Sequence, residues 1–165
     1  MTLEELLSNF RLSKIRIGPK WLAMEISYQE EDQNAAWELY VEMLTRIVTQ
    51  PLPAEAGDEK TALDSIYSLF PTTREILRRR GRKTIKFSRI AIPVLNQIVR
   101  PFTSKWHKES LSGAWSDTKK RDVFRKELKA LQEDLSNYNR MLADIADVED
   151  LTDLEQAPKM GQKEA

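Results

Sequence analysis

Residues 116–148 read SDTKKRDVFRKELKALQEDLSNYNRMLADIADV, and this stretch decides the fold. Its large apolar residues recur in alternating steps of four and three: Phe124, Leu128, Leu131, Leu135, Tyr138, Leu142 and Ile145. Charged and amide side chains fill most positions between them, so this heptad pattern predicts one long amphipathic helix with a single apolar seam. The seven seam residues are a candidate protein interface. We expect the other helices of the chain to bury them instead, because those helices also need cover.

The length and composition of the chain limit what it can be. Its 165 residues suffice for one domain, which we place at 1–151, followed by a disordered polar tail at 152–165. Lysine and arginine together number 26, as do aspartate and glutamate, so the net charge predicts no partner. The chain has no cysteine and no signal-peptide pattern after Met1. Both features suit a reducing cytoplasm, and we expect no metal and no cofactor.

Periodicity and breaker residues predict the fold class. We expect it to be mainly α: a four- to five-helix bundle with a small N-terminal β-hairpin and the long C-terminal heptad helix. The expected elements are a β-hairpin at 10–28 and helices at 32–50, 59–80, 85–108 and 116–148. The hairpin rests on alternation of polar and apolar residues on both sides of Gly18 and Pro19. Pro71, Pro93 and Pro101 should bend or break their helices. The longest apolar run, 90–99, is too short to span a membrane.

The densest charge in the chain lies between Arg74 and Arg89, where eight cations face one acid, Glu75. The cations are Arg74, Arg78, Arg79, Arg80, Arg82, Lys83, Lys86 and Arg89. Such a cluster can bind phosphate, so these residues are a candidate nucleic-acid surface. The alternative is structural: the cations complement a helix end near Gly81 and pair with carboxylates elsewhere. We favour this alternative, with the acids of 144–155 as partners, because the charges of the whole chain balance.

Arg100 and the single histidine, His107, are the candidate catalytic residues. Six residues separate them, and this spacing resembles the Arg-x(4-6)-His motif of HEPN-type ribonucleases, which are helical bundles. The resemblance implies metal-independent RNA cleavage, with His107 in acid–base catalysis and Arg100 steadying the phosphate. Pro101 stands where that family prefers a polar residue. We favour a packing or capping role for His107 beside Trp106.

Two segments, 65–77 and 90–107, resemble parts of small helical proteins from bacteria. That resemblance brings no site residues, and it implies a role beside a larger partner in a bacterial defence system. We therefore expect an interaction or assembly subunit without catalysis, which docks on a larger protein or forms a homo-oligomer. Nucleic-acid binding by the 74–89 cluster is the first alternative, and RNA cleavage by Arg100 and His107 is the second.

Overall fold

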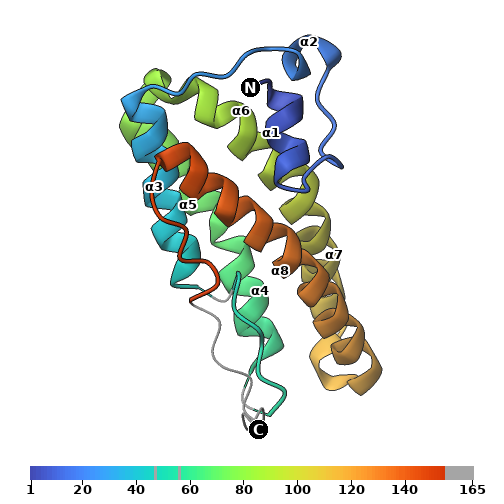
Figure 1. The fold of residues 1–165 in the computed structure, drawn as a ribbon. Helices are drawn as coiled ribbons and strands as arrows, with labels where there is room; N and C mark the ends of the chain where they lie inside the picture. Colours follow the sequence, from blue (N-terminus) through green and yellow to red (C-terminus); the bar gives the residue numbers. More distant parts are fainter. Residues whose placement is uncertain (47, 56, 155–165) are drawn as a thin grey trace, which may run out of the picture.

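The fold is a helical bundle, shown in Figure 1. The computed structural model describes residues 1–46, 48–55 and 57–154. Position 47 of the expected helix 32–50 and positions 155–165 of the expected tail therefore lie outside the described residues, as does position 56. The long helix α8 (Thr118–Ala146) crosses the other helices diagonally. It begins after Asp117, whose carboxylate accepts hydrogen bonds from the first amides of the helix.

The heptad seam of α8 lies in the core of the chain. All seven of its residues are buried, and none is more than 5% exposed. Their cover comes from α3 (Glu30–Leu44), α4 (Glu59–Tyr67), α7 (Arg100–Leu111) and the 3₁₀ turn η3 (Ala114–Ser116), of which α3 makes the most extensive contact. The seam is thus covered within one chain and has no exposed surface to offer to a partner.

Two of the expected helices have different limits. The helix expected at 32–50 ends at Leu44, and the Thr49 hydroxyl then donates to the Met43 carbonyl near that helix end. The helix expected at 59–80 is divided at Ser68 into α4 and α5 (Leu69–Arg80). Pro71 lies in the first turn of α5, where backbone N–H groups have no acceptor within the helix, so its lack of an N–H costs no helical hydrogen bond. A 3₁₀ turn, η1 (Gly81–Thr84), follows α5.

The apolar helix expected at 85–108 consists of three consecutive pieces. They are α6 (Ile85–Pro93), a π-helical stretch η2 (Val94–Val99) and α7. At the end of η2 the Arg100 N–H donates to the Leu95 carbonyl, five residues earlier. Pro93 and Pro101 stand just outside the two ends of this stretch, and neither can donate a backbone hydrogen bond.

The β-hairpin expected at 10–28 is wrong. The chain begins with α1 (Leu3–Asn9), and the expected turn forms the short helix α2 (Pro19–Leu22). Pro19 at the first helical position favours this outcome, because its fixed φ suits a helix start. Among the described residues, antiparallel pairing here is a single bridge between Thr2 and Glu25.

The backbone groups that the hairpin would pair find other partners. The Gln97 side chain accepts a hydrogen bond from the Arg16 N–H at 2.7 Å and donates to the Arg16 carbonyl at 2.8 Å. On the other side, the Ile26 N–H donates to the Met1 carbonyl at 2.9 Å. The segment after α2 is therefore extended, as its alternation indicates, but it pairs with the start of the chain.

The described end of the chain also differs from expectation. Thr152, which we placed in the disordered tail, is buried. Its hydroxyl donates to the Asp150 carboxylate at 2.6 Å and accepts from the Asn139 amide of α8 at 3.3 Å. The chain thus stays attached to α8 beyond the helix end. In the part of the chain that the structure describes, no helix combines the length and apolar composition needed to cross a bilayer.

Candidate interaction surfaces

The basic cluster at 74–89 is divided by the fold. Arg79 and Arg80 extend from α5 to α3, where both pair with Glu38. Arg80 also pairs with Glu31, at 3.0 Å. These two arginines tie α5 to α3 and are not available to an outside phosphate without loss of those pairs.

The other six cations face different surroundings. Lys86 donates to the backbone and side chain of Ser27, and the Arg89 guanidinium lies 5.0 Å from the centre of the Trp21 ring. Both therefore hold the N-terminal segment against α6. Four cations are exposed and form no ion pair among the described residues: Arg74, Arg78, Arg82 and Lys83.

The acids expected to pair with the basic cluster lie elsewhere. Within 144–154, the Asp150 and Asp153 carboxylates pair with Arg140 of α8, at 3.9 and 2.7 Å. The segment after α8 also packs on α3, because the Leu151 N–H donates to the Tyr40 hydroxyl. Among the described residues of the chain the expected pairing with these acids is therefore not formed, and α3 supplies the carboxylates that meet α5.

The ion pairs of Glu38 predict a pH dependence. The hydrogen bond from Arg79 lowers the pKa of Glu38 below its ordinary value of 4.5. The folded state therefore binds this proton less readily than the unfolded state. The resulting stability is present above the unfolded pKa and is lost as the pH falls through the folded pKa. We expect Glu38→Gln to lower the free energy of unfolding by about 1 kcal/mol at about pH 7, and by less at about pH 3.

Urea denaturation at the two pH values measures this difference. Glu75→Gln is the matched control, since Glu75 of α5 forms no ion pair among the described residues. A loss for Glu38→Gln that is the same at both pH values would contradict the prediction.

Arg100 and His107 both lie on α7, and each contacts a different aromatic ring. The Arg100 guanidinium lies 4.6 Å from the centre of the Phe70 ring and donates to the Asn96 side chain at 3.0 Å. The His107 ring meets the Tyr67 ring edge-on, with centres 5.1 Å apart. Neither residue lines the two surface hollows described next. Packing contacts therefore account for both side chains.

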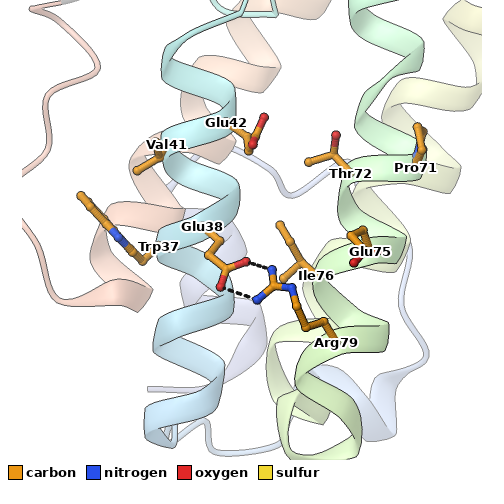
Figure 2. A pocket seen from close by; sticks show the side chains of 9 residues that line it. All are labelled: Trp37, Glu38, Val41, Glu42, Pro71, Thr72, Glu75, Ile76 and Arg79. Atoms are coloured by element: carbon orange, nitrogen blue, oxygen red, sulfur yellow. Dashed lines mark hydrogen bonds and ion pairs between the residues drawn. The ribbon is translucent and has the colours of Figure 1, made fainter.

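A groove of about 520 Å³ lies between α3 and α5, and we name it the α3–α5 groove. Figure 2 shows its lining residues: Trp37, Glu38, Val41 and Glu42 from α3, and Pro71, Thr72, Glu75, Ile76 and Arg79 from α5. The Glu38 and Arg79 side chains reach toward each other between the two helices. Trp37 is 45% exposed and Val41 is 38% exposed. This groove thus places large apolar side chains at the surface beside carboxylates.

A second hollow, of about 270 Å³, lies between the N-terminal segment and α6, and we name it the α2–α6 hollow. Its lining is apolar except for Ser88 and Arg89. Three of its apolar side chains are largely exposed: Trp21, Ile85 and Ile92. The two hollows lie on different elements and are separate surfaces.

Sequence reasoning missed both surfaces. Trp37 belongs by spacing to the apolar stripe of its helix, yet the buried face of α3 consists of Ala35, Ala36, Leu39, Tyr40 and Met43. The two alanines contribute little to the hydrophobic pattern, and the tryptophan contributes much. The pattern therefore predicts a buried face centred on the tryptophan. In 85–93 the spacing that continues at Val94 and Ile98 places Phe87 and Ile90 on the buried face, which the structure confirms. The exposed Ile85 and Ile92 fall outside that face, and this was the signal for the second surface.

Both hollows are lined by apolar side chains beside charged ones. Among the described residues, no three histidine, aspartate or glutamate side chains are placed together to hold a metal ion. No family model, curated protein or solved structure matches this chain.

Proposed function

We propose that this chain is a non-catalytic interaction module that binds an apolar segment of a partner protein in the α3–α5 groove. The observation that carries the proposal is the exposure of Trp37 and Val41 at this groove. Apolar side chains grouped around a hollow are typical of protein interfaces, and tryptophan is a frequent anchor residue.

The charges of the groove indicate the character of the partner segment. Glu38 pairs with Arg79, and Glu42 pairs at 3.0 Å with Arg46, which lies just after the end of α3. Glu75 is the lining carboxylate with no ion pair among the described residues. A partner segment with apolar side chains for Trp37 and a lysine or arginine opposite Glu75 would complement this surface.

The two alternative functions have less support. For nucleic-acid binding, half of the eight cations of 74–89 are engaged by other groups of the chain, which leaves four for phosphate. For RNA cleavage, Arg100 is held by Phe70 and Asn96, and His107 packs on Tyr67. We therefore propose neither.

Site-specific photocrosslinking in the native host tests the proposal. A photoreactive phenylalanine analogue replaces Val41 in the groove, and in a second variant it replaces Val123 of α8 as the control, since the two valines are similarly exposed. We expect a covalent adduct of one discrete mass from position 41 alone. Peptide mapping should place the crosslink in an apolar segment of the partner that carries a lysine or arginine.

A second substitution links the adduct to the groove. Adding Trp37→Asp to the position-41 variant puts a charge where the partner needs an apolar anchor, so the adduct should fall at least about tenfold. Equal adducts from positions 41 and 123, or no adduct at position 41, would refute docking in this groove.

A further inference from the structure

The α2–α6 hollow is lined by apolar side chains of which three are about half exposed. Trp21 is 42% exposed, Ile85 is 54% exposed and Ile92 is 47% exposed. Ile85 and Ile92 are seven residues apart on α6, so they lie on one face of the helix about 10 Å apart along its axis. Trp21 lines the same hollow from α2. Figure 1 places α1, α2 and α6 at the same end of the bundle.

Cations surround these apolar side chains. The Arg89 guanidinium lies 5.0 Å and the Lys20 ammonium 5.7 Å from the centre of the Trp21 ring. Arg82 and Lys83 are exposed and precede Ile85 by three and two residues. The nearby Glu25 carboxylate does not offset this charge, because it pairs with the N-terminal ammonium at 2.9 Å. The first turn of α1 adds the acids Glu4 and Glu5, which are fewer than the cations Lys20, Arg82, Lys83, Lys86 and Arg89. This end of the bundle is therefore apolar and, on balance, cationic.

We propose that this end of the molecule binds the surface of an anionic lipid bilayer, with Trp21, Ile85 and Ile92 inserted at the level of the headgroups. Tryptophan is favoured at that depth because its ring is apolar and its N–H is polar. Lysine and arginine beside it can extend their charges to anionic headgroups while their stems stay in apolar surroundings. The contact is peripheral and occurs at a surface separate from the α3–α5 groove.

The shape of the hollow favours a bilayer over an acidic helix of another protein. A helix that binds in a groove buries several anchor side chains, one turn apart, in a receptor cavity. The hollow, at about 270 Å³, is smaller than the cavities that enclose ligands of drug size. Three of its apolar side chains, Trp21, Ile85 and Ile92, instead keep between 42% and 54% of their surface in water, and insertion into another phase would cover this area. The complementary charge is spread over a face, as in an anionic membrane surface.

Vesicle co-sedimentation with the whole chain tests this proposal. The probes are vesicles of phosphatidylcholine alone and vesicles with about 30% phosphatidylserine, in about 0.1 M salt. We expect binding to the anionic vesicles to be at least about tenfold tighter than binding to the neutral ones, and to weaken strongly at about 0.5 M salt. Equal binding to the two kinds of vesicle, or none, would overturn the proposal.

Matched variants locate the contact. Trp21→Ala and the double variant Arg82→Gln/Lys83→Gln should each reduce binding to anionic vesicles about fivefold or more, since these two cations are exposed and form no ion pair among the described residues. Trp37→Ala should leave it unchanged, because Trp37 is equally exposed but lies in the α3–α5 groove. Circular dichroism must show each variant folded, and Ile92→Ser replaces any variant that is not. Equal losses for the variants at positions 21 and 37 would refute the location.

A binding experiment with soluble polyglutamate distinguishes a lipid surface from an acidic protein as the binding partner. If soluble polyglutamate binds through Trp21 while anionic vesicles do not, the surface serves an acidic polypeptide and the lipid proposal is wrong. Failure of the vesicle experiment would leave the photocrosslinking at position 41 unaffected, since the two tests probe different surfaces.

Discussion

Replacing Phe124 with alanine is expected to lower the free energy of unfolding by about 3–5 kcal/mol, the largest effect we predict. Phe124 is fully buried, and three aromatic rings surround it. The ring centres of Trp106, Trp115 and Phe102 lie 5.1, 5.0 and 5.4 Å from its own. The first two contacts are edge-on, a favoured geometry that the alanine loses together with the buried area. The cavity left among these rings adds to the loss.

Urea denaturation followed by circular dichroism measures this effect. Val123→Ala is the matched control, because Val123 precedes Phe124 on the same helix and is 46% exposed. Its effect should stay within about 0.5 kcal/mol. Since the seam is covered within one chain, the midpoint of unfolding should not change over about a hundredfold range of protein concentration. A midpoint that rises with concentration would place the cover of the seam in a second chain.

Asp32→Ala is expected to cost about 2–3 kcal/mol, the second largest effect. The Asp32 carboxylate is buried and joins two helix starts. One oxygen accepts from the Phe87 N–H of α6 at 2.9 Å, and the other accepts from the Gln29 N–H before α3 at 3.1 Å. Phe87 is fully buried, and its N–H belongs to the first turn of α6, which lacks helical acceptors. Alanine would leave that N–H without a partner.

Two variants separate this bond from a general effect of charge. Glu30→Ala also removes an acid from the first turn of α3, but Glu30 is exposed, so its loss should be only a few tenths of a kcal/mol. Asp32→Asn keeps one acceptor oxygen and should fall between the two. Chemical denaturation of all three variants measures the order. If Asp32→Ala and Glu30→Ala lose the same free energy, the bond to Phe87 does not hold α6 in place.

The heptad helix could be predicted because its information is local. Steps of four and three over seven apolar residues define one face of a helix whatever the rest of the chain does. The N-terminal segment could not be predicted in this way, because its pairing partners are remote. Gln97, which satisfies the Arg16 backbone, lies 81 residues away in sequence. Alternation shows that a segment is extended, but it does not name the group that receives its hydrogen bonds.

The ion-pair partners of the basic cluster also could not be predicted, because they are remote in sequence. Its surplus is evident in the sequence, yet the carboxylates that receive Arg79 and Arg80 lie 41 to 49 residues earlier, on α3. Acids are frequent in this chain, and only the packing of α3 on α5 selects Glu31 and Glu38 from them. The exposure of Trp37 is equally a result of packing, since the paired alanines beside it form the buried face.

The π-helical stretch η2 changes the direction around the helix axis in which the apolar residues after it point. Apolar residues before, within and after it recur strictly every four positions: Ile90, Val94, Ile98, Phe102 and Trp106. In an α-helix each step of four overshoots a full turn by about 40°, so four steps would carry the last residue about 160° around the axis. All five side chains are nevertheless buried. The wider turn of the π-helix takes up part of this offset. It thereby fixes how far Phe102 and Trp106, at one end of the segment, are rotated about the axis relative to Ile85 and Arg89 at the other end.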